Sequence, residues 1–387
     1  MEKYFLDLTA LVVATVIVSY VLMRLKQPLL IAYIVTGIMI GPWGFKIIKE
    51  IDFISAISHL GIIFLLFLAG LVLHPQKLIR LFREVFWATV LASLLSFLTA
   101  LLVSLLLGFG VCESLFVGIA LMFSSTVLTV KLLPTTKLHH KKIGAICIGV
   151  LILEDILAVL VLAFIHAYRA ELSFLTVSAI ILLKVAALFT VAILFERYVF
   201  KYLIRHIERV HEMIFIFAIA WCFGNGWLSY RIGLSFEIGA FIAGVVLARH
   251  PVSLFISERL KPLRDFFLLL FFFSLGARIN LSLTLGLLPF ALLLSVIYVI
   301  LKPIYFNKLL QWREENKSLS KEAGIRLGQS SEFSLLIGLA LLEYGFITHR
   351  VFNFIEITTV LTIMFSSYIV VFLYPTPIGV NKSLIQD

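Results

Sequence analysis

LILEDILAVL, residues 151–160, places two adjacent carboxylates, Glu154 and Asp155, in the middle of an apolar stretch over residues 143–167. A helix of that length crosses a hydrocarbon core of about 30 Å. A charge at this depth costs at least about 2.5–3.5 kcal/mol, so each one needs a reason. Mutual repulsion and lost hydration both oppose ionisation, so protons and hard cations can compete for the same oxygens. The alternative is a neutralised pair that only holds helices together.

The composition of the whole chain agrees with a membrane protein. Of its 387 residues, 61% are apolar and 14% are charged, whereas soluble proteins carry about 25% charged residues. We expect an all-α polytopic membrane protein with about 13 transmembrane helices. The expected spans cover residues 5–23, 28–42, 56–73, 84–107, 113–132, 143–167, 173–195, 212–230, 233–248, 262–277, 281–306, 325–342 and 351–373.

The distribution of Lys and Arg predicts the orientation of these spans. With the N-terminus outside, 23 of the 32 basic residues fall on the cytoplasmic side and 7 on the outer side. This bias is what the positive-inside rule requires. The net charge of +10 is therefore a topology signal and does not indicate nucleic-acid binding. We predict an outer N-terminus and a cytoplasmic C-terminus.

Two lysines within the predicted spans are candidate partners for the carboxylate pair. Lys184 lies near the centre of its span, and Lys302 lies towards the cytoplasmic end of a long span, beside Pro303. Position alone does not decide between them.

Polar residues interrupt the span over residues 113–132 and the span over residues 325–342. The first contains Ser124, Ser125 and Thr126 in succession, and the second contains GQSSE, residues 328–332. Such residues permit an unwound segment where it lines a cavity. The two spans run antiparallel, and matching breaks in opposed halves indicate inverted repeats with two crossed discontinuous helices. Glu332 either joins the ion site or caps a half-helix.

Six sequence segments resemble, in the same order, motifs of the cation:proton antiporter-2 family. This family includes bacterial sodium/proton antiporters and the membrane part of glutathione-gated potassium-efflux antiporters. The segments are LGIIFLLFLAGLVL (60–73), FSSTVLTVKLL (123–133), LILEDILAVL (151–160), SFEIGAFIAGVVLA (235–248), FFFSLGARIN (271–280) and GQSSEFSLL (328–336).

The resemblance implies a role for each residue of the expected site. Asp155 matches the ion-binding aspartate. Lys302 matches the lysine that pairs with the preceding acid, here Glu154, which favours Lys302 over Lys184. Ser125 and Thr126 match the unwound segment near the ion. The remaining site candidates, from the two breaks, are Ser124, Ser330, Ser331 and Glu332.

The resemblance also implies a homodimer that moves by an elevator mechanism. We expect dimerisation helices in residues 1–82 and 212–280, a mobile core in 83–170 and 281–373, and a linker helix in 171–211. The chain continues only briefly after its last span, so we expect no C-terminal nucleotide-binding domain. Glu at position 154 matches neither the Asp of many sodium exchangers nor the Gln of the glutathione-gated systems.

The expected function is secondary active exchange of a monovalent cation for protons across a bacterial or archaeal cytoplasmic membrane. Na⁺ is the first candidate, and a K⁺/H⁺ antiporter without its regulatory domain is the alternative; a cation channel is a third possibility. The expected partners are Na⁺ or K⁺, protons, membrane lipids and a second copy of the chain. We expect no enzymatic activity and no cofactor, since no H-E-x-x-H motif and no second intramembrane aspartate are present.

Overall fold

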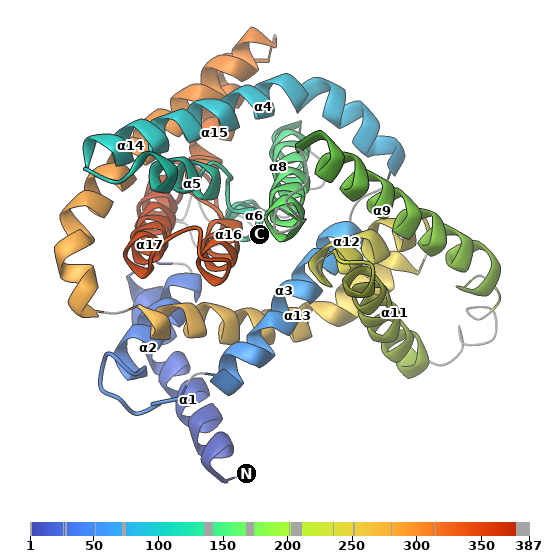
Figure 1. Ribbon diagram of the computed structural model, residues 1–387, viewed down its shortest axis with the longest axis horizontal. Coiled ribbons are helices and arrows are strands. Elements are labelled where there is room, and N and C mark those ends of the chain that lie inside the picture. Colours follow the sequence, from blue (N-terminus) through green and yellow to red (C-terminus); the bar gives the residue numbers. More distant parts are fainter. Residues whose placement is uncertain are drawn as a thin grey trace. The chain divides into compact units, whose positions relative to one another are not determined.

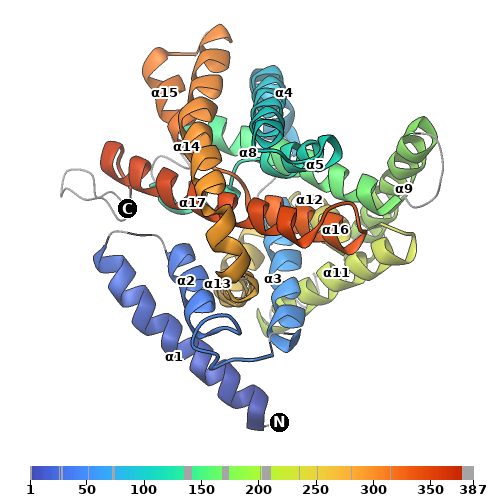
Figure 2. The same cartoon turned by 60° about the vertical axis from the view of Figure 1, so that its left-hand side comes forward.

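Helices form the regular structure of the chain in the computed structural model (Figures 1 and 2). Packing divides the chain into two compact units, which are described separately. The first unit comprises Met1–Ile51, Arg80–Ala158 and Phe272–Asp387, and the second comprises Asp52–Ile79 and Val159–Phe271. The structure describes residues 2–25, 27, 29–50, 52–71, 75–134, 142–167, 174–200, 202, 211–234, 236–250, 252–279, 281–313 and 315–376.

The first unit holds helices from the beginning, middle and end of the chain. Those that lie wholly within it are α1 (Glu2–Arg24), α2 (Leu29–Ile40), α5 (Val111–Leu121), α6 (Thr126–Leu132), α14 (Leu281–Trp312), α15 (Lys317–Arg326), α16 (Glu332–Glu343) and α17 (His349–Leu373). Helix α17 packs against α14, α16, α5, α6 and α15, so it is the central contact of this unit. Helices α4 (Pro75–Leu106), α8 (Lys142–Ala167) and α13 (Ser253–Arg278) contribute residues to both units.

The second unit is organised around the short helix α12 (Phe236–Leu247). Helices α3 (Asp52–Leu71) and α11 (His211–Arg231) pack against α12, as does α9 (Phe174–Phe195), which continues into the π-helical turn η2 (Glu196–Phe200). A Cβ atom on Gly244 of α12 would lie 2.9 Å from the Cα of Gly70 in α3. These glycines therefore let two backbones approach closely, as small residues do between membrane helices.

Two of the predicted spans are each divided into two helices. The expected span 113–132 consists of α5 and α6, and the expected span 325–342 lies over α15 and α16. The breaks fall at residues 122–125 and 327–331, where the sequence predicts unwound segments. Each of the other predicted spans coincides with a single helix, with ends that differ by several residues.

The second break lies tightly against the middle of α14. A Cβ atom on Gly324 would lie 2.5 Å from the carbonyl oxygen of Pro303, and one on Gly328 would lie 2.7 Å from the Cγ atom of Pro303. Larger residues at these two positions would push α15 away from α14. The glycines thus bring the break within reach of Lys302, the residue before Pro303.

Six helices in the described part of the chain are long and apolar enough to cross a membrane, namely α1, α4, α8, α11, α14 and α17. The shorter helices α2, α5 and α12 are also apolar. The predicted all-α polytopic fold is confirmed. The assignment of dimerisation, core and linker helices stays a prediction, and several residues of the expected linker lie outside the described residues.

Candidate functional site

The two helix breaks contact each other directly within the first unit. The Ser124 hydroxyl donates to the carbonyl of Leu327 at 3.0 Å, and the Thr129 hydroxyl donates to the carbonyl of Arg326 at 3.0 Å. The Gln329 amide donates in return to the Thr129 hydroxyl at 2.9 Å. Hydroxyl and amide groups of one break therefore satisfy backbone and side-chain groups of the other, and the two discontinuous helices cross here.

Helices α5 and α16 run in opposite directions on one side of this crossing. The Phe116 ring in α5 lies 5.5 Å, between centroids, from the ring of Phe346, which follows α16. The Thr348 hydroxyl, also beyond the end of α16, donates to the Glu113 carboxylate in the first turn of α5 at 3.3 Å. The start of α5 is therefore close to the end of α16, which is the arrangement that inverted halves require.

Each break ends at a serine that caps the following helix. The Ser125 hydroxyl accepts from the backbone N–H of Leu128 at 3.0 Å, and the Ser331 hydroxyl accepts from the N–H of Phe333 at 3.1 Å. Such caps satisfy N–H groups that have no partner within the helix. Helices α6 and α16 thus both start, with their positive dipole ends, beside the crossing. The polar runs in the sequence therefore act as helix starts.

Glu154, on α8, is hydrogen-bonded to the first break. Its side chain is fully buried on α8. It accepts a hydrogen bond from the backbone N–H of Ser124 at 2.8 Å and another from the Ser93 hydroxyl of α4 at 3.1 Å. One carboxylate oxygen bonds the unwound backbone and the other bonds a neighbouring helix. Glu154 therefore holds the break in position.

Asp155 is directed towards the start of α6. The Thr126 hydroxyl lies 3.1 Å from one of its carboxylate oxygens and 3.0 Å from the other. Asp155 is 4% exposed. Glu332, in the first turn of α16, and Glu154 both act electrostatically on Asp155. Three carboxyl groups therefore gather near the crossing, and buried acids of this kind mark ion or proton sites in membrane proteins.

Lys302 joins the two breaks. Its ammonium group donates to the carbonyl of Phe123 in the first break at 2.8 Å and to the carbonyl of Gln329 in the second at 3.1 Å. The group also lies 5.6 Å from the ring centroid of Tyr298. Lys302 acts on Glu154 through space, but the described residues include no direct ion pair between the two. Its contacts are with unwound backbone, which the sequence does not reveal.

The other predicted residues divide between the crossing and the second unit. The backbone N–H of Ser330 donates to the Thr362 hydroxyl of α17 at 3.1 Å, which ties the second break to that helix. Glu332 is 2% exposed and influences Asp155, so it lies close to the predicted ion site. Lys184, the alternative partner, belongs to α9 in the second unit, where its ammonium group is near Gly233.

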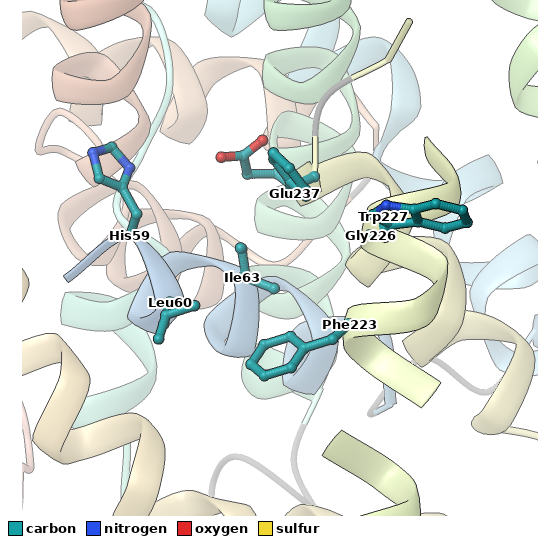
Figure 3. A pocket seen from close by; sticks show the side chains of 8 residues that line it. His59, Leu60, Ile63, Phe223, Gly226, Trp227 and Glu237 are labelled. Carbon is teal, nitrogen blue, oxygen red and sulfur yellow. The ribbon is translucent and has the colours of Figure 1, made fainter. Parts of the chain in front are cut away.

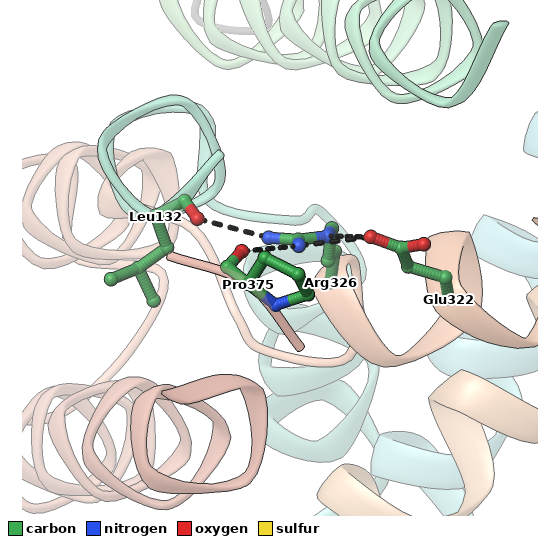
Figure 4. A network of polar contacts seen from close by, with 4 residues as sticks. All are labelled: Leu132, Glu322, Arg326 and Pro375. Atoms are coloured by element: carbon green, nitrogen blue, oxygen red, sulfur yellow. Dashed lines mark hydrogen bonds and ion pairs between the residues drawn. The ribbon is translucent and has the colours of Figure 1, made fainter. Parts of the chain in front are cut away.

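Arg326 is a further buried charge, which the sequence does not single out as a site residue. It is 1% exposed, and Figure 4 shows its guanidinium group between three partners. The group donates to the Glu322 carboxylate at 3.0 and 2.9 Å, to the carbonyl of Leu132 at 3.0 Å and to the carbonyl of Pro375 at 2.9 Å. Arg326 thus ties α15 to the end of α6 and to the segment after α17.

Tyr374 completes this cluster on the other side of Arg326. The guanidinium carbon lies 5.6 Å from the centroid of the Tyr374 ring. Burial and the charge of Glu322 raise the pKa of Tyr374, and the charge of Arg326 opposes that shift. The phenol therefore stays neutral at physiological pH and stacks as a neutral ring.

The second unit contains a separate apolar pocket of about 520 Å³. Figure 3 shows it between α3, α11 and α12, with the carboxylate of Glu237 on the side where His59 lies. The remaining lining residues are Leu60, Ile63, Phe223, Gly226, Trp227 and Phe236. None of the predicted ion-site residues belongs to this pocket.

Comparisons with known proteins agree with this geometry. The model of the family "Sodium/hydrogen exchanger, transmembrane" matches residues 10–374. In fold, the chain is similar to the sodium proton antiporter MjNhaP1 from Methanocaldococcus jannaschii, with a TM-score of 0.71, 17% identity and 94% of each chain covered.

Two curated relatives are similar in sequence. The chain is 29% identical over 348 residues to K(+) efflux antiporter 5 of Arabidopsis thaliana, covering 86% of this chain and 60% of that protein. It is 29% identical over 328 residues to the glutathione-regulated potassium-efflux system protein KefC of Escherichia coli O45:K1, covering 81% of this chain and 51% of that protein. The chain thus spans a little over half the length of these relatives. By its family match, it is a multi-pass membrane protein that belongs to the sodium/hydrogen exchanger transmembrane family.

Proposed function

We propose that this chain exchanges a monovalent cation for protons across the membrane, with Na⁺ as the first candidate cation and K⁺ as the second. The observation that carries the proposal is the environment of Asp155. This carboxylate is buried, receives the Thr126 hydroxyl, and lies beside two further carboxylates, Glu154 and Glu332. A group in such a place is expected to bind either a proton or a cation, and exchange follows from that competition.

The cycle uses the unwound backbone as a substitute for water. On the side with few protons, Asp155 loses its proton and binds a dehydrated cation with the help of Thr126, Ser125 and backbone carbonyls of the break. Carbonyls at a broken helix are suited to replace a cation's hydration shell. The core then moves to the other side, the cation leaves, and a proton takes its place on Asp155. Competition for one carboxylate couples the two flows.

Glu154 and Lys302 have a supporting role in this scheme. Glu154 holds the backbone of Ser124, and Lys302 holds carbonyls of both breaks. Both residues hold the two broken helices in contact while the cation or proton enters and leaves. Because Glu154 and Asp155 are adjacent, their titrations are coupled and belong to the pair.

Replacing Asp155 with Asn tests the proposal directly. In everted vesicles, addition of Na⁺ or K⁺ is expected to move protons with the natural chain and not with Asp155→Asn. The matched control is Asp265→Asn, which removes a carboxylate whose side chain is 46% exposed. Cation-dependent proton movement that survives Asp155→Asn at the natural rate rules out the assignment.

K⁺ exchange is the second candidate because both curated relatives carry potassium efflux in their names. Purified protein in liposomes, with Na⁺, K⁺ and Li⁺ each tested against an imposed proton gradient, separates the two candidates. Saturable flux driven by the counter-gradient supports exchange, and flux that runs only down the cation's own gradient supports a channel.

We also propose a homodimer with an outer N-terminus and a cytoplasmic C-terminus in a bacterial or archaeal cytoplasmic membrane. The exposed Cys112, at the start of α5, lies on the outer side in this topology. A membrane-impermeant maleimide is expected to label it in intact cells, and labelling only after lysis contradicts the topology. The mass of the purified protein, corrected for detergent, tests the dimer.

A further inference from the structure

Glu356 is a buried carboxylate that the cation-exchange scheme does not use. It lies in the sequence NFIEITT, residues 353–359, within α17, and its side chain is fully buried. Neither of its carboxylate oxygens has a hydrogen-bond partner among the described residues. Glu154 and Asp155, by contrast, both accept hydrogen bonds. A buried carboxyl group without a partner calls for an explanation such as a water molecule, an ion or a proton.

Hydroxyl groups without hydrogen-bond partners in the described structure lie on α17 and on the neighbouring helix α16. Thr358 and Thr359 on α17 and Ser334 on α16 are buried, and their hydroxyl oxygens have no hydrogen-bond partner in the described part of the chain. The Ser330 hydroxyl in the second break is also buried and has no hydrogen-bond partner among the described residues. We call Ser330, Ser334, Thr358, Thr359 and Glu356 the α16–α17 seam.

The packing register of α16 and α17 aligns these groups. At one end, the N–H of Ser330 bonds the Thr362 hydroxyl. Further along, a Cβ atom on Gly338 would lie 3.3 Å from the ring of Phe352. Residue numbers rise on one helix as they fall on the other, so Ser334, midway between these two contacts, lies at the level of about residue 357, beside Glu356 and Thr358. Thr359 is one helical turn from Glu356, the spacing that brings side chains together.

The seam leads from the ion site towards one membrane face. It begins at the second break, next to Glu332, which acts on Asp155, and it reaches Glu356 two turns from the start of α17. The turn between α16 and α17, where Thr348 bonds Glu113 at the start of α5, lies between two predicted spans and is therefore at a membrane face in the predicted topology.

Arg278, at the end of α13, is the charge that acts on Glu356. Other titratable groups lie on α17 itself and on the helices packed against it. The titratable side chains on α17 are His349, Arg350 and Tyr368. On the helices packed against α17 they are Tyr298, Lys302, Tyr305 and Lys308 on α14, Lys317, Lys321, Glu322 and Arg326 on α15, Glu332 and Glu343 on α16, and Cys112 and Glu113 on α5. Helix α6 carries Lys131, whose side chain lies outside the described residues.

We propose that Glu356 is a second proton-binding group, and that the α16–α17 seam passes protons between the Asp155 site and the membrane face at the α16–α17 turn. This inference rests on the proposed exchange function. Each hydroxyl accepts one proton and releases one, so it ends unchanged, and Glu356 alternates between carboxylate and carboxylic acid. The ligand of the seam is thus a proton, carried by side chains and by water molecules that bond their free oxygens.

The test compares Glu356→Gln with Glu343→Gln in reconstituted protein. Both changes remove one carboxylate charge, but Glu343 is exposed at the end of α16. Glu356→Gln is expected to lower cation-driven proton flux by about a hundredfold or more, the lower end of the range for a proton-transfer group, and to change the pH profile of the flux. Stabilisation against heat by added cation is expected to persist, because Asp155 is intact. Glu343→Gln is expected to behave as the natural chain.

A second readout observes the proton itself. Infrared difference spectra between high and low pH are expected to contain a buried carboxylic-acid carbonyl band that Glu356→Gln removes and Glu343→Gln keeps. If the natural chain exchanges cations while Glu356→Gln leaves the flux, the pH profile and this band unchanged, the inference is overturned and the proposed function stands. If the natural chain exchanges no cation, both are overturned.

Thr359→Val replaces Glu356→Gln if the latter does not fold. It keeps the shape of the side chain and removes one hydroxyl of the seam. A reduced flux with intact cation-induced heat stabilisation supports the inference, and the natural flux overturns it.

Discussion

Replacing Arg326 with Ala tests whether its guanidinium group holds three segments of the first unit together. The change removes the hydrogen bonds to Glu322, to the carbonyl of Leu132 and to the carbonyl of Pro375. Those bonds connect α15, the end of α6 and the segment after α17. Since both carbonyls depend on the same buried group, the loss is expected to loosen the three segments together.

The expected cost follows from the groups left behind. The buried carbonyl of Leu132 without its donor costs about 1–3 kcal/mol, and the partly buried carbonyl of Pro375 costs less. The Glu322 side chain is 15% exposed, so water partly replaces its lost partner. The total is about 3–5 kcal/mol, the range for removing one member of a buried ion pair. Since about 1.4 kcal/mol is a factor of ten, local opening is expected to become roughly 100- to 4,000-fold more frequent.

Cysteine labelling measures this opening at a defined place. Cys147 is buried in a core cluster that includes Leu327, the residue after Arg326, whereas the buried Cys222 belongs to the second unit. In a Cys112→Ser background, Arg326→Ala is expected to accelerate labelling of Cys147 by the factor above and to leave Cys222 unchanged.

A matched control removes a more exposed arginine that also contacts a carboxylate. Arg264 lies 3.0 Å from Asp265, with side chains 23% and 46% exposed. Exposed pairs contribute about 0–1 kcal/mol, so Arg264→Ala is expected to leave Cys147 labelling nearly unchanged. If Arg326→Ala leaves the Cys147 rate within about threefold of the natural chain, well under the expected 3–5 kcal/mol, the reasoning is refuted.

Three further changes test the site and the packing. Lys302→Met removes the ammonium group that bonds carbonyls of both breaks. Cation-coupled proton flux is expected to be lost and heat stability reduced, and natural flux contradicts this role. Thr126→Val removes the hydroxyl on Asp155 and is expected to raise the cation concentration for half-maximal flux by about tenfold, the effect of about 1.4 kcal/mol; an unchanged value argues against a cation at Asp155. Gly276→Val forces a side chain against the backbone of α2 and is expected to lower the melting temperature. Gly286→Val, which has open space around it, is expected to leave the melting temperature unchanged. Equal melting temperatures for the two variants contradict the close packing at Gly276.

The sequence predicts the helices well because lipid imposes a simple rule on composition and length. It also predicts both breaks, because Ser125 and Ser331 are the residue type that caps a helix start, and both serines do so. Helix ends are predicted less well. Helix α14 continues to Trp312, past its predicted end at residue 306, because a helix can leave the apolar layer without a change in its hydrogen bonding.

Contacts between side chains and backbone atoms of distant segments are not predicted from the sequence. The pairing of Lys302 with Glu154 stays a prediction. The hydrogen bonds of Lys302 to carbonyls of the two breaks could not be predicted, because every residue carries a backbone carbonyl. The burial of Arg326 also depends on backbone carbonyls of Leu132 and Pro375, which are distant in sequence. Glu356 has a visible signal, a lone acid within an apolar span, which the same rule on intramembrane charges identifies.

The position of Lys302 has a consequence for how membrane voltage acts on the protein. Its ammonium group is bonded to both breaks, so it is expected to travel with them and with Glu154. When both are ionised, their charges cancel in the moving part. Asp155 is then neutral with either a proton or a monovalent cation bound, and the field does no net work on a one-for-one cycle. An unbalanced charge would instead bring a bias of about 2.3 kcal/mol per 100 mV. We therefore expect exchange to run at the same rate whether or not a potential is imposed with an ionophore.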